Sequence, residues 1–273
     1  MPKSAQDRPR PETINTLVAG VYPALAMLAG MQLELFTPLG DGAQSVDELA
    51  AALDIDATRL RPLLYALVSA GLLEVAGEKF ANTAEADTFL VKGRRGYLGG
   101  QHEVYADLWQ STLLTADSIR SGQPQAKHDF GAMGKAELAA FMRGLDAGAG
   151  AAARRLMKSH DLGRFRNLLD AGGGGGGLAA TLCAANPELA GTVVELPLVA
   201  EVAAEMIAER GLTERVSSVG CDVVSEPPPG RYDLAVLRAF LQVLGPNAAA
   251  RALANVAQSI EPGGEIFIIG RVL

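Results

Sequence analysis

The sequence predicts an α/β protein in which a doubly wound parallel sheet follows a smaller, mainly α-helical domain. From residue 166 onward, short apolar runs typical of strands alternate with helical patterns, which predicts a parallel sheet with helices on both faces. Before residue 98 the order is helix, helix and hairpin, as in a winged-helix unit. We therefore expect a winged-helix domain over 1–98, connecting helices over 99–160 and the parallel sheet over 161–273.

Composition and charge disfavour several classes of protein. Hydrophobic residues make up 49% of the 273, enough for a sizeable core, while two cysteines and three histidines give neither a disulfide framework nor a metal site. A formal net charge of −7 disfavours nucleic acid as a partner. The polar N-terminus has no apolar signal core, and no apolar run approaches the ~20 residues of a membrane span. We expect a cytoplasmic protein with no membrane partner.

The first 39 residues combine a polar arm with an apolar helical segment. Residues 1–11 are polar and proline-rich and should form a disordered arm, whereas 14–39 are almost wholly apolar. Pro23 should divide that segment into two short helices. Helices that are apolar on all sides need burial on all sides, either inside the domain or against a partner subunit. Because a small domain offers little interior, the sequence favours a homodimer over intramolecular packing.

Capping residues outline the winged-helix unit. Ser45 and Glu48 match a capping box at the start of one helix, and Asp56 can cap a second helix that ends near Gly71. A hairpin with its turn at 76–78 follows. The apolar face of the second helix is formed by Leu60, Leu63, Leu64 and Leu67.

A winged-helix unit is typical of DNA-binding proteins. Only Arg59 and Arg61 on the second helix could reach a base or a phosphate, and the whole chain is acidic. The sequence therefore favours a structural or dimerising role for this unit, with no nucleic-acid partner.

Helices with aromatic faces are expected between the two domains. His102, Tyr105 and Trp109 recur at helical spacing on one face, and Phe141 and Leu145 are similarly spaced on a later helix. These stripes are typical of ordinary core packing, and they are also compatible with the wall of an aromatic pocket.

The C-terminal part predicts five strands and three helices in alternation. Its strands are expected at 167–171, 191–196, 215–222, 232–241 and 264–270, and its helices at 178–187, 199–212 and 247–260.

Six consecutive glycines, 172–177, lie between the first of these strands and the helix that follows it. Glycines at such a turn let the backbone approach a ligand, so this run predicts a cofactor cradle and not a linker. A dinucleotide site is one candidate, since Gly172, Gly174 and Gly177 fit G-x-G-x-x-G with Glu195 as the acid. Asp170 before the turn, however, suits a cofactor that carries an ammonium group. Asp222, which ends the third strand and is placed to meet an adenine edge, and the Pro-Gly-Gly at 262–264 also favour a nucleotide-like cofactor other than a dinucleotide.

The ordered motifs resemble the class I S-adenosylmethionine (SAM) methyltransferases. They are most similar to the dimeric small-molecule O-methyltransferases of the plant phenolic, acetylserotonin and bacterial polyketide type. LLDAGGGGGG matches that family's D-x-G-G-G-x-G, VVELPLV its D-L-P-x-V, and RVSSVGCDVV its R-V-x-x-x-x-G-D. YDLAVLRAFLQVL and SIEPGGEIFII complete the series, and the resemblance extends over nearly the whole chain from about residue 14.

This resemblance implies a Rossmann-like methyltransferase domain, a winged-helix dimerisation domain and a small-molecule acceptor. SAM, with S-adenosylhomocysteine (SAH) as its product, would lie beside Asp170 and the glycine turn. Glu195 would accept both ribose hydroxyls and Asp222 the adenine amino group. Further cofactor contacts are implied for Gly172, Gly174, Gly176, Leu196, Val223 and Arg238. An apolar acceptor pocket is implied for Tyr105, Trp109, Phe141, Leu145 and Phe240.

The sequence departs from the family pattern at several positions. The family's catalytic L-H-D-W reads Leu-Gln-Val-Leu here, so Gln242 stands where the general-base histidine is usual, and His102 is the alternative candidate. Glu195 replaces the usual aspartate, and Gly175 a common hydroxyl residue. The chain also stops at Leu273, after the fifth strand, where the fold normally continues with further C-terminal strands.

Two hypotheses follow. In the first, the protein is a methyltransferase of a small, aromatic or polyketide-like natural product that works without a histidine base, with O-, C- and N-transfer all open. In the second, the same fold binds SAM but serves as a repurposed scaffold that methylates nothing.

Overall fold

The computed structural model describes residues 9–94, 96–125, 130 and 132–270, and the chain divides into two compact units, 1–106 and 107–273. Each unit is considered by itself. The predicted division into segments 1–98, 99–160 and 161–273 stays a prediction. Most of the expected N-terminal arm, and the residues after 270, lie outside the described residues.

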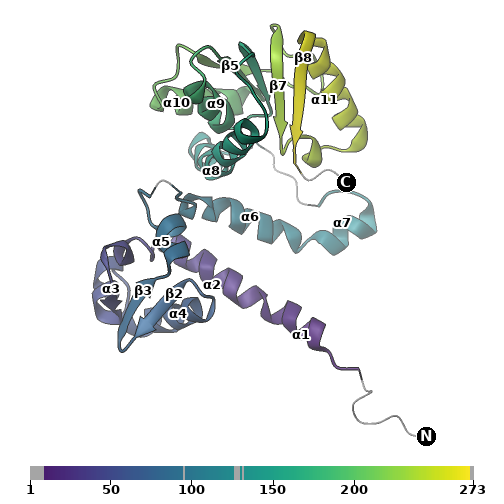
Figure 1. The fold of residues 1–273 in the computed structure, drawn as a ribbon. Helices are drawn as coiled ribbons and strands as arrows, with labels where there is room; N and C mark the ends of the chain where they lie inside the picture. The colour runs from purple at the N-terminus through teal and green to yellow at the C-terminus, as the bar shows by residue number, and fades with distance from the viewer. Residues whose placement is uncertain (1–8, 95, 126–129, 131, 271–273) are drawn as a thin grey trace, which may run out of the picture. The chain divides into compact units, whose positions relative to one another are not determined.

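The first unit is mainly helical and carries a small antiparallel sheet of order β1-β3-β2 (Figure 1). Its helices are α1 (Glu12–Ala19), α2 (Val21–Gln32), α3 (Val46–Leu53), α4 (Ala57–Ser69) and α5 (Ala84–Leu90), with 3₁₀ turns η2 (Pro38–Asp41) and η3 (Gly99–Gln101). Its strands are β1 (Gln44–Ser45), β2 (Leu73–Ala76) and β3 (Lys79–Asn82).

The predicted caps of the winged-helix unit are present. The Ser45 hydroxyl accepts from the N–H of Glu48, whose carboxylate accepts from the N–H of Ser45 at 2.7 Å, so the capping box is complete. Asp56 accepts from the N–H of Arg59 at the start of α4. Gly77, with φ +62, makes the hairpin turn between β2 and β3. The core of the unit includes Leu35, Phe36, Leu60, Leu64, Leu67, Leu73 and Phe80, while Leu63 is only partly buried.

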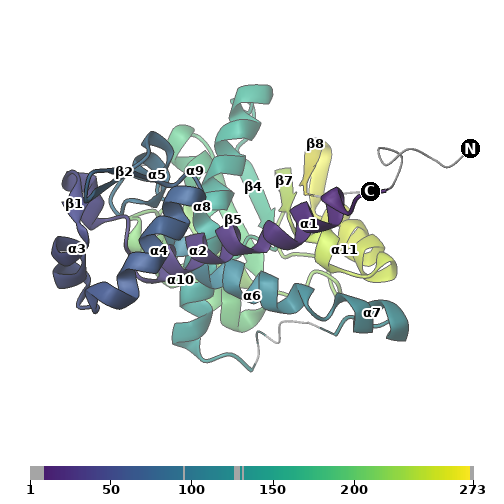
Figure 2. The same ribbon diagram turned by 90° about the horizontal axis from the view of Figure 1, so that it is seen from below.

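Two expectations about the apolar N-terminal segment were wrong. The break between its helices falls at Gly20 and not at Pro23, because Pro23 occupies the third position of α2, where its missing N–H costs no helical bond. The helices also follow one another as a nearly continuous rod, Glu12–Gln32, of 21 residues and hydropathy 1.5 (Figure 2). By length and composition that rod could cross a membrane, whereas we expected no apolar run of that length; the expected lack of a membrane partner stays a prediction. A single such helix is weak evidence for a span.

The second unit is a five-stranded parallel sheet of order β6-β5-β4-β7-β8, which confirms the predicted fold class. Its strands are β4 (Asn167–Ala171), β5 (Ala190–Glu195), β6 (Val216–Gly220), β7 (Tyr232–Arg238) and β8 (Ile260–Ile269). Its helices are α7 (Thr115–Ser121), α8 (Lys135–Ser159), α9 (Gly177–Ala185), α10 (Pro197–Glu209) and α11 (Pro246–Gln258), with η4 (Leu241–Val243). Helix α6 (His102–Thr112) crosses the boundary between the two units.

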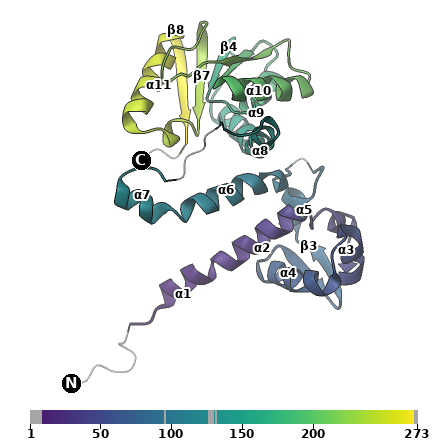
Figure 3. The same cartoon turned by 180° about the vertical axis from the view of Figure 1, so that it is seen from behind.

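Helices cover both faces of this sheet. Helices α8, α9 and α10 lie on one side and α11 on the other, as Figures 1 and 3 show from opposite directions. Leu168, Val193 and Leu234 face the first group, and their neighbours Leu169, Val194 and Ala235 face α11. Alternate residues of β4, β5 and β7 are thus buried on opposite faces, which explains why these strands read as nearly continuous apolar runs.

Strand β8 begins earlier than predicted. Its pairing with β7 jumps from Ile260, opposite Tyr232, to Glu265, opposite Leu234, so the Pro-Gly-Gly at 262–264 forms an irregularity inside the strand and does not precede it. Gly263 takes φ +85 there. The order of the sheet reverses between β4 and β7, and the carboxyl ends of strands at such a switch point form the usual ligand site of a doubly wound fold.

Candidate functional site

Charged side chains from three strands meet at the carboxyl edge of the sheet. Asp170 comes from β4, Glu195 ends β5 and Arg238 ends β7. The parallel register places β5 and β7 on either side of β4, so the three groups interact electrostatically around Asp170.

The glycine turn connects β4 to α9 and cannot hold side chains at several of its positions. Gly172, Gly174 and Gly176 adopt φ +67, +57 and +77, which L-residues rarely take. A Cβ on Gly172 would lie 2.5 Å from the Phe240 ring, and one on Gly173 would lie 2.6 Å from the carboxyl carbon of Asp170. Glycine is therefore required here by backbone conformation and by close packing together.

Asp170 lies beneath this turn and is only 1% exposed. Its Oδ2 accepts from the N–H of Ala179 at 3.1 Å, whereas its buried Oδ1 has no hydrogen-bond partner. Burial raises the pKa of Asp170 to about 7; the Ala179 N–H opposes this rise, Glu195 adds to it, and Arg238 opposes it. An orphaned, buried acceptor below a glycine cradle fits a cationic group of a ligand.

Glu195 braces the turn from the neighbouring strand. Its Oε1 accepts from the N–H of Gly174 at 2.9 Å, and its Oε2 accepts from the N–H of Leu196 at 3.1 Å. Burial raises the pKa of this carboxyl. Each oxygen keeps a second lone pair, so the geometry leaves room for the expected ribose hydroxyls.

The residues expected near an adenine ring follow β5 and β6. Leu196 is 40% exposed, while Val223 is only 3% exposed and packs into the core against α11. The carboxylate of Asp222 accepts from the N–H of Val224 and from the hydroxyl of Ser225, which holds the local turn. Cys221 donates its N–H to the carbonyl of Glu195, so the ends of both strands adjoin.

The expected acceptor residues are distributed over both units. Phe141 and Leu145 lie on α8, where Phe141 contacts Phe130 with ring centroids 6.0 Å apart. Phe240 packs over Gly172. Trp109, on α6, is half-buried in the second unit, whereas Tyr105 belongs to the first unit, where its hydroxyl donates to Gln101.

Gln242 and His102, the two candidates for handling a proton, differ in setting. Gln242 lies in η4 and is exposed; its Oε1 lies 2.7 Å from where a Cβ on Gly270 would be. Just before it, Ala239 takes a strained φ of +54. His102 begins α6 in the first unit; its Nδ1 is buried without a hydrogen bond and lies 3.7 Å from the Glu103 carboxylate.

Asp146 and Arg210 also contact the glycine turn, and the sequence analysis missed them. Arg210 donates to the carbonyl of Gly175 and forms an ion pair with Asp146, which is on α8. The packing of α8 against α10 brings them together across 64 positions of sequence, and no local motif marks either residue.

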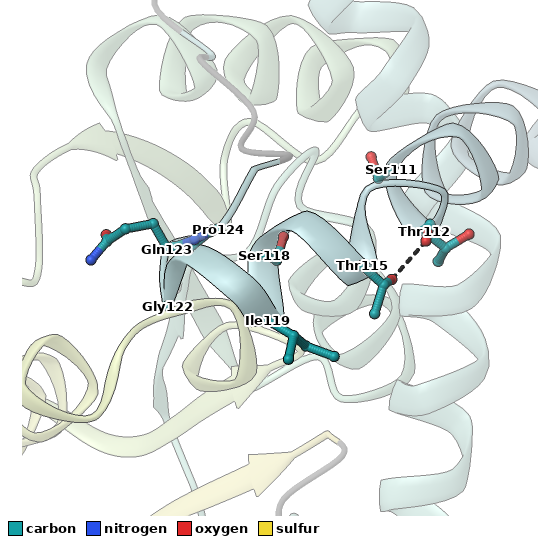
Figure 4. A pocket seen from close by; sticks show the side chains of 8 residues that line it. All are labelled: Ser111, Thr112, Thr115, Ser118, Ile119, Gly122, Gln123 and Pro124. Atoms are coloured by element: carbon teal, nitrogen blue, oxygen red, sulfur yellow. Dashed lines mark hydrogen bonds between the residues drawn. The ribbon is translucent and has the colours of Figure 1, made fainter.

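A separate hollow of about 570 Å³ lies on α6, α7 and the loop that follows (Figure 4). Its lining consists of Ser111, Thr112, Thr115, Ser118, Ile119, Gly122, Gln123 and Pro124. None of these is a predicted site residue, and Thr115 donates its hydroxyl to the carbonyl of Thr112 at 2.6 Å.

Comparisons with known proteins agree with this architecture. Residues 115–273, more than half of the chain, match the model of the O-methyltransferase domain, and residues 16–92 match that of the O-methyltransferase dimerisation domain. The chain belongs to the O-methyltransferase family. The predicted family and the enzyme class, a SAM-dependent methyltransferase, are thereby confirmed.

Individual relatives of this methyltransferase are named for methyl transfer to oxygen or to nitrogen. It is 30% identical to 3-hydroxy-5-methyl-1-naphthoate 3-O-methyltransferase of Streptomyces sahachiroi, over 94% of this chain and 76% of that protein. It is 29% identical to the N,N-dimethyltransferase OxyT of Streptomyces rimosus, over 92% of this chain and 76% of that protein. Among solved structures, PigF with SAH superposes with a TM-score of 0.80 at 25% identity, covering 95% of this chain and 81% of PigF.

Proposed function

We propose that this methyltransferase binds SAM over the glycine turn 172–177 and transfers its methyl group to a small aromatic or polyketide-like acceptor, without a histidine general base. The observation that carries the proposal is the buried, partnerless Oδ1 of Asp170 beneath a turn that excludes side chains. When bound, SAM would supply a methyl group that its sulfonium already activates.

The residues at the strand ends have separate tasks in this proposal. Asp170 would bind the ammonium group of the cofactor, and the two oxygens of Glu195 would accept the ribose hydroxyls while still bracing the turn. Leu196 would cover one face of the adenine, and Asp222 would accept its amino group. The charge of Arg238 opposes the rise that burial causes in the pKa of Asp170, so it would favour the ionised form of that carboxyl.

The nature of the acceptor follows from Gln242. A glutamine amide has no group that accepts a proton near neutral pH, so it can orient an acceptor but cannot deprotonate it. Methyl transfer then depends on positioning and on acceptors that are already ionised or carry a neutral nucleophile. Relatives that are named for transfer to oxygen and to nitrogen are compatible with both outcomes.

The alternative is a scaffold that binds SAM and methylates nothing, and glutamine at 242 is the observation that favours it. An assay with methyl-labelled SAM across phenols of graded pKa, arylamines and acidic carbon acceptors separates the two. Label in an acceptor together with formation of SAH supports the enzyme. SAM binding with no label in any acceptor supports the scaffold.

We also infer that residues 12–32 pair with a second copy of the chain. Ile14, Leu17, Val18 and Tyr22 are 64%, 70%, 60% and 71% exposed, and the segment overlaps the dimerisation-domain match at 16–92. Several large apolar side chains exposed along one helical segment are typical of a protein interface. The inference agrees with the sequence expectation of a homodimer, and the expected cytoplasmic location and lack of nucleic-acid binding stay predictions.

Light scattering tests the homodimer with single substitutions. Leu17→Glu and Tyr22→Glu should convert a dimer to a monomer at micromolar concentration, because each places a charge in the proposed interface. Val75→Glu, at an exposed apolar position on β2, is the matched control and should leave the mass unchanged. A wild-type chain that is monomeric under these conditions rules out the inference.

A further inference from the structure

An ion pair away from the strand ends contacts the glycine turn. Arg210, which caps the C-terminus of α10, donates its Nη1 to the carbonyl of Gly175 at 3.0 Å and to that of Met206 at 3.2 Å. Its Nη2 pairs with the carboxylate of Asp146, which comes from α8. One guanidinium therefore connects the turn to two helices.

Asp146, the partner of Arg210, also lies against the turn. Its carboxylate lies against Gly177, the first residue of α9, where a Cβ would be 2.5 Å from Oδ1, so the positive end of that helix faces a carboxylate of the protein itself. Its side chain is only 18% exposed. Burial raises the pKa of Asp146, and the charge and hydrogen bond of Arg210 oppose that rise. The pair is thus largely withdrawn from solvent, unlike the other ion pairs between α8 and α10.

The turn needs support of this kind because it has no side chains of its own. Six consecutive glycines lose more conformational freedom on ordering than any other six residues would. At Gly175, where the resemblance led us to expect a hydroxyl residue, the space of a side chain is filled from outside. A Cβ there would lie 2.6 Å from the Met206 methyl and 3.2 Å from Asp146 Oδ1.

We propose that Asp146 and Arg210 are positioning residues, which hold the backbone at Gly175 and Gly177 so that the glycine turn keeps its ligand-binding shape. This inference rests on the proposed function of the turn. The two side chains act through the backbone: Arg210 donates to the turn, to the carbonyl of Met206 and to Asp146, and replacing either residue loosens the turn without removing a contact to the acceptor.

The chain provides matched controls for a test. Lys135 and Glu205 also bridge α8 and α10, with Nζ and Oε1 2.7 Å apart, but they are exposed and make no hydrogen bond to the turn. Arg210→Gln is therefore compared with Lys135→Gln, and Asp146→Asn with Glu205→Gln. Arg210→Lys keeps the charge but loses the two-sided donor geometry, so it serves as a milder variant that retains folding.

Two readouts are measured on the full chain: hydrogen exchange of peptides that cover 170–178 without cofactor, and SAM affinity by calorimetry. Arg210→Gln and Asp146→Asn should each speed exchange of the turn about tenfold or more and weaken SAM about tenfold, with Arg210→Lys between them and wild type. The double variant should be no worse than the more severe single variant, because the two residues act as one unit. The control variants should stay within about twofold of wild type.

Hydrogen exchange tests the positioning role, and SAM binding by the wild type tests the proposed cofactor site, so the two claims can be contradicted separately. Turn exchange that is the same in pair and control variants would overturn the positioning role, whatever the SAM affinities are. A wild type that shows protected turn amides but no SAM binding would instead contradict the proposed cofactor site, while the role of Asp146 and Arg210 in holding the turn would be unaffected.

Discussion

The two ends of the proposed reaction site are built in different ways. At the cofactor end, Asp170 and Glu195 are fixed at the ends of central strands, and their pKa values are raised by burial. At the acceptor end, Gln242 lies on the exposed 3₁₀ turn η4 and carries no titratable group. Under the proposed function, the sheet would set the binding of the methyl donor, whereas proton removal from the acceptor would be left to the acceptor's own acidity.

The largest effect is expected from restoring a base at the acceptor end. Gln242→His should raise methylation of a high-pKa phenol by ~10²–10⁴, since that is the usual worth of general-base assistance. Rates are measured with saturating labelled SAM, and Gln242→Asn is the control that adds no base. Robust turnover of such a phenol by the wild type, lost in Gln242→Ala but kept in His102→Ala, would contradict our interpretation of this position.

An intermediate effect is expected at the cofactor end. Glu195→Ala should weaken SAM by roughly 1–3 kcal/mol, because two charge-assisted hydrogen bonds to the ribose are lost and the N–H of Gly174 loses its acceptor. Glu195→Gln should lie closer to wild type because it keeps an acceptor oxygen. Equal affinities in wild type and Glu195→Ala, measured by calorimetry, would place the ribose elsewhere.

A smaller, graded effect is expected from pH. The pKa of Asp170 is about 7 in the free protein, and only the ionised carboxylate attracts an ammonium, so SAM affinity should fall about tenfold per pH unit below 7. The groups that face Asp170 are Glu195 on β5, Arg238 on β7 and Asp146 on α8. Asp170→Asn should remove most of this slope between pH 5.5 and 7. A slope that is the same in both proteins would assign it to another group.

The same pKa has a consequence for stability with the opposite sign. A carboxyl whose pKa is raised on folding, here from 3.8, favours the folded state most at pH below its unfolded value, and this contribution is lost as pH rises toward 7. Between pH 5 and 8, the cofactor-free wild type should therefore lose stability relative to Asp170→Asn. Urea titrations of both proteins at the two pH values measure the difference.

Local patterns were sufficient to predict most of the fold. The capping box at Ser45 and Glu48, the Asp56 cap and the alternating strands and helices after 166 each depend on neighbours within a few residues. The break at Gly20 was missed because proline in a first helical turn costs nothing. The early start of β8 was missed because its glycines at 263 and 264 read as a turn before the strand.

The candidate site was predictable only as far as its motifs extend. Asp170, the glycine turn and Glu195 follow one another along consecutive elements, so their meeting at one edge could be expected from the topology of a parallel sheet. Asp146 and Arg210 reach the turn only through the packing of α8 on α10. The sequence carries no local signal for such a contact, because it depends on the way two helices cover the sheet.

The central claim, that Asp170 and the glycine turn form a SAM site, is tested most directly by one calorimetric comparison at pH 7.5. Wild type and Asp170→Asn are each titrated with SAM and with NAD. We expect heat from SAM and none from NAD with the wild type, and SAM affinity at least about tenfold weaker in Asp170→Asn, since the ammonium loses its charged partner. Preferential binding of NAD, or SAM affinity that Asp170→Asn leaves unchanged, would contradict the claim.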